Sequence, residues 1–136
     1  MNNCYYADAA QIKKLRQLIA DAKLNVPDGF EETSIENLQK CYNGIGPQAW
    51  SICFRSYVTR ILNSFEPEAL IHDWEYTYSP KQYCFFTIAN VRFLLNGIKY
   101  SFYLYGLNSR TLKQVRLALI LALLCQLFGW SAYRRN

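Results

Sequence analysis

The chain contains a single histidine, His72, and an aspartate, Asp73, follows it directly. An imidazole exchanges protons near neutral pH and a carboxylate binds cations, so this pair could take part in acid–base or metal-assisted chemistry. Two other segments could join it: a glycine-containing loop upstream, Tyr42-Asn43-Gly44-Ile45-Gly46-Pro47, and a downstream segment, Ala89-Asn90-Val91-Arg92-Phe93. The function of the chain depends on whether these three segments form one site.

Two helices are expected to position these residues. Pro67 suits the first turn of a helix, and the three- and four-residue steps of that helix give one face to Ala69, His72, Asp73 and Tyr76. A second helix is expected after Ser79-Pro80, to carry Asn90 and to break at Asn96-Gly97. The short connection predicts an antiparallel pair, so positions near His72 could face positions near Asn90.

The upstream loop has two glycines one residue apart, Gly44 and Gly46, followed by Pro47. This pattern cannot be regular helix or a central strand, and glycines allow neighbouring carbonyl groups to point to one side. An ordinary turn and a ligand-binding loop are both compatible with it.

In this order the three segments resemble the phospholipase A2 superfamily, and most closely its disulfide-poor branches in viral capsid proteins and small phage proteins. The resemblance covers about residues 41–97. In that family a glycine-rich calcium loop precedes a helix with the pattern H-D-x-x-Y, present here as His72-Asp73-Trp74-Glu75-Tyr76. A second, antiparallel helix then supplies an aspartate that orients the histidine.

The resemblance implies a calcium-dependent hydrolase of phospholipid acyl esters, and so a role in lipid degradation. It implies that calcium is held by Asp73 and by the backbone carbonyls of Tyr42, Gly44 and Gly46. It further implies that His72 is the general base and that Tyr76 supports the group that orients its ring.

The sequence departs from the family at residue 90, where Asn90 stands in place of the orienting aspartate. No acidic residue follows Glu75, so no neighbouring position can supply the carboxylate. An amide can hold the ring but cannot neutralise an imidazolium, and the corresponding change in serine proteases lowers the rate by about 10⁴. Two functions therefore stay open: a hydrolase that is slow or inactive, and a non-catalytic binding or virion-associated protein on the same scaffold.

Charge is divided unevenly along the chain. All ten acidic residues lie between Asp8 and Glu75, whereas residues 76–136 carry eight Lys or Arg and no acid. Such a field favours an anionic partner, namely a phospholipid membrane surface, an acidic virion or host protein, or nucleic acid. Nucleic acid is the least favoured, because only Tyr100, Tyr103 and Tyr105 would supply stacking surfaces. A solvated basic helix face is the alternative interpretation.

We expect one mainly α domain spanning residues 1–136, in which the antiparallel pair is flanked by added N- and C-terminal helices. Helices are predicted at residues 8–24 and 33–41, and a long one from residue 108 to residue 128. The strongly apolar run in the last helix is about a dozen residues, short of the ~20 that span a membrane, so we expect a buried central helix. Residues 50–62 are expected to form at most a small β-hairpin.

Other classes of site find little support. Motifs for a P-loop, for H-E-x-x-H and for G-x-S-x-G are absent, and one histidine is too few for a zinc site of the usual kind. Five cysteines without C-x-x-C spacing indicate reduced thiols, and residues 1–5 lack the layout of a signal peptide. We therefore expect the cytoplasm as the site of synthesis, with later association with a virion left open.

Overall fold

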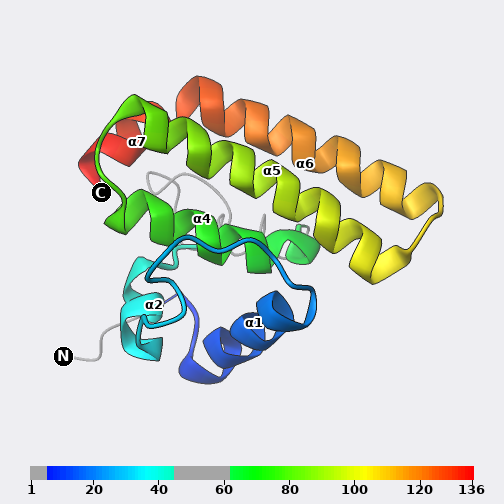
Figure 1. Ribbon diagram of the computed structural model, residues 1–136, viewed down its shortest axis with the longest axis horizontal. Helices are drawn as coiled ribbons and strands as arrows, with labels where there is room; N and C mark the ends of the chain where they lie inside the picture. The colour runs from blue at the N-terminus through cyan, green and yellow to red at the C-terminus, as the bar shows by residue number, and fades with distance from the viewer. Residues whose placement is uncertain (1–5, 45–61) are drawn as a thin grey trace.

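A computed structural model of the chain describes residues 6–44 and 62–136. Within these residues it has no strand, and its helical segments are α1 (Ala9–Asp21), α2 (Ile35–Cys41), the 3-10 turn η1 (Asn63–Phe65), α4 (Glu66–Tyr78), α5 (Tyr83–Tyr105), α6 (Ser109–Phe128) and α7 (Trp130–Arg135) (Figure 1). The prediction of a mainly helical chain is confirmed for this part. The hairpin predicted within residues 50–62 falls almost entirely on residues 45–61, which lie outside the described residues.

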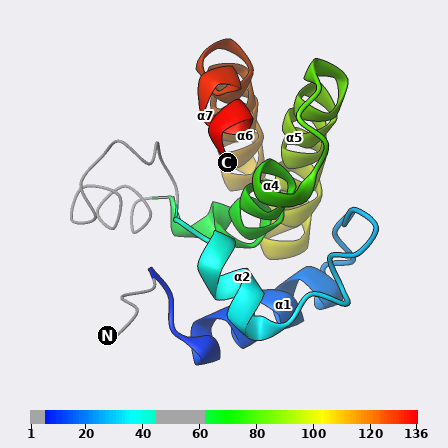
Figure 2. The ribbon, with the colours of Figure 1, turned by 90° about the vertical axis from the view of Figure 1, so that its left-hand side faces the viewer.

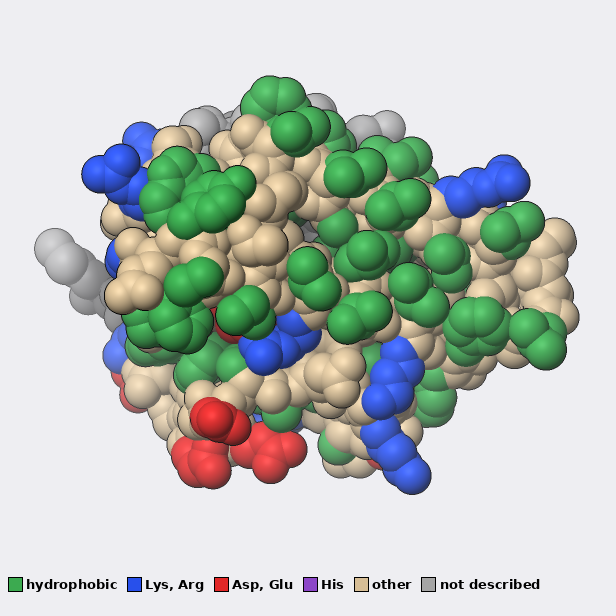
Figure 3. Space-filling model, turned by 45° about the horizontal axis from the view of Figure 1, so that its top comes forward, with side chains coloured by type: hydrophobic (Ala, Val, Ile, Leu, Met, Phe, Trp, Pro, Cys, Tyr) green, Lys and Arg blue, Asp and Glu red, His purple; other side chains and the backbone are tan. Residues whose placement is uncertain are grey.

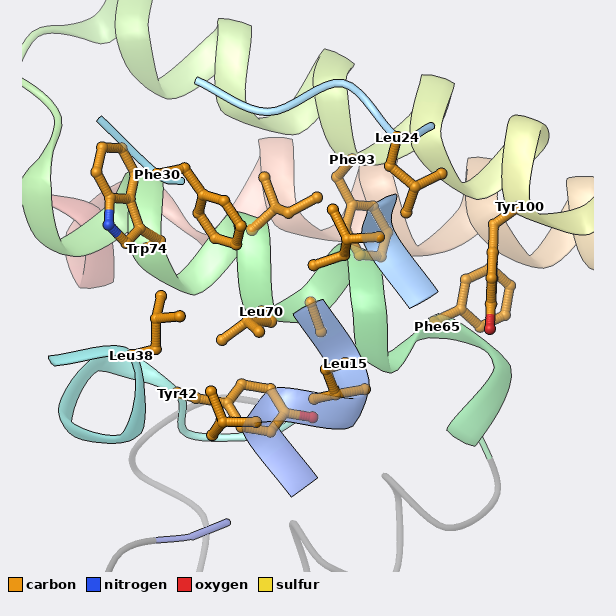
Figure 4. Packing of buried hydrophobic residues seen from close by; sticks show 14 of the residues in the cluster. Leu15, Leu24, Phe30, Leu38, Tyr42, Phe65, Leu70, Trp74, Phe93 and Tyr100 are labelled. Atoms are coloured by element: carbon orange, nitrogen blue, oxygen red, sulfur yellow. The ribbon is translucent and has the colours of Figure 1, made fainter. Parts of the chain in front are cut away.

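Helix α4 lies at the centre of the fold. The pair α5 and α6 covers one side of it, and α1 and α2 cover the other (Figures 1 and 2). Figure 4 shows side chains from four of these helices converging in the core: Leu15 of α1, Leu38 of α2, Leu70 of α4 and Phe93 of α5. The core is therefore built around α4, the helix that carries His72.

The N-terminal helices form where helical spacing and end caps agree. Helix α1 buries Ile12, Leu15 and Ile19, and the Asp8 carboxylate accepts a hydrogen bond from the Gln11 backbone N–H at 2.7 Å. It ends at Asp21, before the predicted end at residue 24, because the chain turns where Lys23 has a φ of 51°. The loop that follows is tied to α5 by Asn96, whose side chain bonds both the N–H and the C=O of Asn25 at 2.8 Å.

The helices α4 and α5 pack antiparallel across the short connection of residues 79–82, as the sequence predicted. An ion pair between Glu75 of α4 and Arg92 of α5 lies near the end of α4, and Phe65 and Phe93 stack at 6.5 Å near its start. These contacts set the register in which residue 72 faces residue 90.

The break predicted at Asn96-Gly97 is wrong, because α5 runs without interruption to Tyr105. Gly97 instead allows α6 to approach closely, since a Cβ atom added there would lie 2.8 Å from the Cβ of Ala118. The side chain of Asn96 is fully buried and bonded to residue 25, so it does not compete with the helix backbone. A glycine therefore suits residue 97 because of its small size, and not because it forms a turn.

The prediction that the last long helix is a buried central helix is also wrong. Helix α6 packs on α5 through Ala118 and Ala122 and leaves most of its other side chains exposed. Within the described residues it is the one helix that is long and apolar enough to cross a membrane, judged by length and composition. Periodicity could not separate these cases, since a helix that is apolar all round gives the same pattern whatever surrounds it.

The close approach of α5 and α6 gives a stability prediction for Gly97→Ala. Alanine favours a helix by about 1 kcal/mol over glycine, but the new methyl group would overlap Ala118, and overpacking costs about 1–3 kcal/mol. Because the Ala118 Cβ is fixed to its helix backbone, we expect a net loss of about 1 kcal/mol in the free energy of unfolding, measured by urea denaturation.

The matched control is the same substitution in an Ala118→Gly background. There the overlap is absent, so Gly97→Ala should be neutral or stabilising. Equal effects of Gly97→Ala in both backgrounds would show that residues 97 and 118 are not coupled.

Candidate functional site

The predicted face of α4 turns inward against α5. Ala69, His72 and Tyr76 are buried, and the ring centroids of His72 and Tyr76 are 4.1 Å apart. Phe93 of α5 packs against the imidazole, with ring centroids 5.3 Å apart. His72 therefore lies among aromatic rings with only 8% of its surface exposed.

Asn90 meets both polar side chains of this face. Its Oδ1 lies 2.8 Å from Nε2 of His72 and accepts a hydrogen bond from the Tyr76 hydroxyl at 3.1 Å. An amide oxygen can only accept, so in this orientation of Asn90 the proton of the neutral imidazole is on Nε2. The other ring nitrogen, Nδ1, then carries the lone pair that could take a proton.

Gln126 of α6, which was not predicted from the sequence as a site residue, completes this hydrogen-bonded group. Its Oε1 accepts from Nδ2 of Asn90 at 2.8 Å, and its Nε2 donates to Tyr83 at 3.0 Å and to Thr87 at 3.2 Å. Gln126 thus holds the Asn90 amide with its oxygen toward His72. One sequence signal could have found it: Gln126 is the only amide or charged side chain between Leu117 and Phe128.

Burial has a large effect on the acid–base behaviour of His72. It lowers the pKa of the imidazole from 6.5 to about 4, and the hydrogen bond to Asn90 only partly opposes this. The ring is therefore neutral at pH 7, with a lone pair on Nδ1. The same burial disfavours the imidazolium that would form if the ring accepted a proton.

Asp73, the fourth residue of the predicted face, is half-buried and points toward the segment Tyr42–Gly44. Its Oδ2 accepts a hydrogen bond from the backbone N–H of Asn43 at 2.9 Å. Gly44 has a φ of 76° and lies against the ring of Tyr6, so a larger residue would be both strained and obstructed there. Of the four residues expected to bind calcium, Asp73, Tyr42 and Gly44 thus belong to one region of the fold, and Gly46 lies outside the described residues.

The Asp73 carboxylate is a ligand of the kind that a hard cation takes, and its contact with this segment is to a backbone N–H, not to a carbonyl. Calcium takes carboxylate and backbone carbonyl oxygens, and here a carboxylate reaches the backbone of a glycine-containing segment. The described residues contain no group of three or more His, Cys, Asp or Glu side chains that could hold a metal ion. Calcium bound here would therefore depend on backbone carbonyls as well as on Asp73.

Helix α7 closes the end of the site beside Tyr76. Tyr133 packs edge-on against Tyr76 at 5.0 Å, and its hydroxyl donates to the carbonyl of Pro80 at 2.6 Å. Gly129, which joins α6 to α7, leaves room for the Tyr76 hydroxyl, since an added Cβ would lie 2.6 Å from it. The C-terminal helices thus contribute directly to the surroundings of His72.

Comparisons of the chain with protein-family models, curated proteins and solved structures returned no match.

The hydrogen-bonded group predicts the protonation state of His72, which NMR can follow without ambiguity in a chain with one histidine. We expect the folded protein to contain the Nε2–H tautomer and to titrate at a pH of about 4, whereas the urea-unfolded chain titrates near 6.5. The unfolded chain then binds the proton first as the pH falls, so protonation of His72 favours unfolding between these values. A folded-state midpoint near 6.5 would contradict the burial described above.

Substitutions of Gln126 test what holds the tautomer. In Gln126→Leu the Asn90 amide loses the acceptor that fixes it, so the ¹⁵N signals of His72 should shift toward a mixture of tautomers. Gln126→Glu is the matched control, because its carboxylate still accepts from Nδ2 of Asn90. Identical ¹⁵N signals in the wild type and Gln126→Leu would show that Gln126 has no part in orienting the ring.

Proposed function

We propose that the chain is a calcium-dependent, phospholipase A2-like hydrolase of phospholipid acyl esters. One observation carries the proposal: two adjacent residues of α4 serve two different groups. His72 bonds to Asn90, which also holds Tyr76, while Asp73 bonds to the backbone beside Gly44. The three sequence segments resemble the phospholipase A2 superfamily. That resemblance implies the same pairing of an oriented histidine with a carboxylate at a glycine loop.

In the proposed reaction Nδ1 of His72 takes a proton from water while the water oxygen attacks the ester carbonyl carbon. The bond from that carbon to the alkoxy oxygen then breaks, and the proton passes from the imidazolium to the leaving alkoxide. Asn90 and Tyr76 hold the ring during these steps. Asn90 brings no negative charge, so it does not offset the cost of the buried imidazolium, and we expect a slow enzyme.

Calcium would be held by Asp73 and by the backbone carbonyls of Tyr42, Gly44 and Gly46. When bound, it would polarise the ester carbonyl and stabilise the oxyanion. Asp73 is half-buried and directly follows His72 in α4. The helix backbone therefore holds the proposed calcium ligand at a fixed position relative to the proposed base.

A second candidate function is non-catalytic: the same scaffold binds an anionic partner through its basic C-terminal half. Two observations favour it, namely the amide at residue 90 and the pKa of His72 at about 4. The two candidates differ in whether ester hydrolysis depends on His72.

The first test is release of fatty acid from a labelled anionic phospholipid, with calcium and with EGTA. We expect calcium-dependent release that falls by about 10²-fold or more in His72→Gln, because removal of a general base costs this much. Asp73→Asn should raise the calcium concentration needed for half-maximal activity, and Asp28→Asn, an exposed loop position, is its matched control. Activity that is independent of calcium or equal in His72→Gln would exclude the hydrolase.

Asn90→Asp tests the departure from the family. A carboxylate at this position would stabilise the imidazolium, so we expect the pKa of His72 to rise above about 4 and hydrolysis to increase at least about tenfold. Asn37→Asp on the exposed side of α2 serves as the control for an added charge. If the variant folds and neither the pKa nor the rate changes, residue 90 does not act on His72.

A further inference from the structure

The outer side of α5 and α6 carries a broad surface of exposed apolar side chains. On the second half of α6 the exposed large residues occur at helical spacing along one side: Leu119, Ile120, Leu123, Leu124, Leu127 and Phe128. On α5 a parallel row is formed by Ile88, Val91, Leu95 and Phe102. We call these ten residues the α5–α6 face.

This face lies opposite the side on which each helix packs. Helix α6 is buried at Ala118 and Ala122, and the exposed residues follow on the other half of its circumference. Leu127 and Phe128 are 70% and 74% exposed. The face is therefore not part of the core, and no described element of the chain covers it.

Positive charges border the face, and neither α5 nor α6 carries an acidic residue. Arg110, Lys113 and Arg116 occupy the first two turns of α6 and are exposed, and so is Lys99 on α5, whereas Arg92 of α5 is paired with Glu75. All acidic residues of the chain precede residue 76. Figure 3 shows apolar side chains spread over this side of the molecule with Lys and Arg among them, and Asp and Glu gathered at its lower edge.

The combination of exposed apolar side chains with positive charge indicates which kind of partner binds the α5–α6 face. A second copy of the chain would bring two basic surfaces together, which costs free energy at ordinary salt concentration. Nucleic acid would satisfy the charges but leave the leucines and phenylalanines against a hydrated phosphate backbone. An anionic lipid bilayer satisfies both, because headgroups pair with Lys and Arg while acyl chains receive apolar side chains.

We propose that the α5–α6 face docks on the surface of an anionic lipid bilayer, with α6 lying in the plane of the interface. Helix α6 stays on α5 and does not cross the bilayer, since Gly97 and Ala118 fit closely and Gln126 is bonded to Asn90. Leu123, Leu127 and Phe128 enter the acyl boundary, while Lys113 and Arg116 remain at the headgroups. This inference uses neither His72 nor Asp73, so it stands apart from the proposed hydrolysis.

The test is sedimentation of the full chain with vesicles, in EGTA so that calcium and catalysis play no part. We expect the protein to bind vesicles of phosphatidylcholine with phosphatidylglycerol, and to bind pure phosphatidylcholine weakly. High salt should weaken binding without abolishing it, because the apolar contact remains. Leu123→Glu with Leu127→Glu should lower the partition coefficient at least about tenfold, since the two substitutions remove apolar area and add charges that anionic lipids repel.

The matched control is Ala10→Glu with Asn37→Glu, which makes the same change in net charge at exposed positions on α1 and α2. It should bind vesicles like the wild type, and circular dichroism should show that both double variants remain folded. Equal binding by the two double variants would overturn the proposal. So would a wild type that ignores vesicles and forms a dimer that Leu123→Glu with Leu127→Glu dissociates, because the face would then join copies of the chain. A wild type that binds DNA but not vesicles would overturn it as well.

Discussion

The structure depends on the hydrogen bonds of one buried amide. Asn90 lies where α4, α5 and α6 meet, and its side chain bonds to His72, Tyr76 and Gln126. A buried polar group without a partner costs about 1–3 kcal/mol, so a shift of any of the three helices would carry that cost. Together with the Glu75–Arg92 ion pair and the close fit of Gly97 against Ala118, the amide group therefore favours one register of the helices.

Burial makes the hydrogen bonds of Asn90 important for the helix register, and it also limits the acid–base chemistry of His72. The His72 ring is protonated only well below neutral pH, because its pKa is about 4. A neutral amide suits such surroundings, since a buried carboxylate would itself have to be desolvated. Glu75 illustrates this cost nearby: burial raises the pKa of its carboxyl to about 7 although Arg92 opposes the shift. The site thus fixes the orientation of His72 but does little to stabilise the positive charge that the imidazole would acquire on accepting a proton.

Helix α6 has two apolar sides with different uses. Its inner side is made of small residues, Ala118 and Ala122, which allow the close approach to Gly97. Its outer side carries large apolar residues that are between 46% and 74% exposed. Gln126 lies between the two sides and joins the helix to the site, so the helix that we propose to rest on a bilayer is also the one that orients Asn90.

Local sequence determined the helices, and with them much of the candidate site. Helical spacing predicted that His72 and Tyr76 share a face, and the short connection at residues 79–82 predicted that Asn90 lies opposite; the structure brings the three together. Periodicity and turn length carry such information because they act within a few residues. Only the tertiary structure decided that Gly97 is a contact and not a break, that α6 gives only one side to the core, and that Gln126 reaches Asn90 across 36 positions of the chain. These depend on which helix packs beside which, and an apolar pattern does not specify its neighbour.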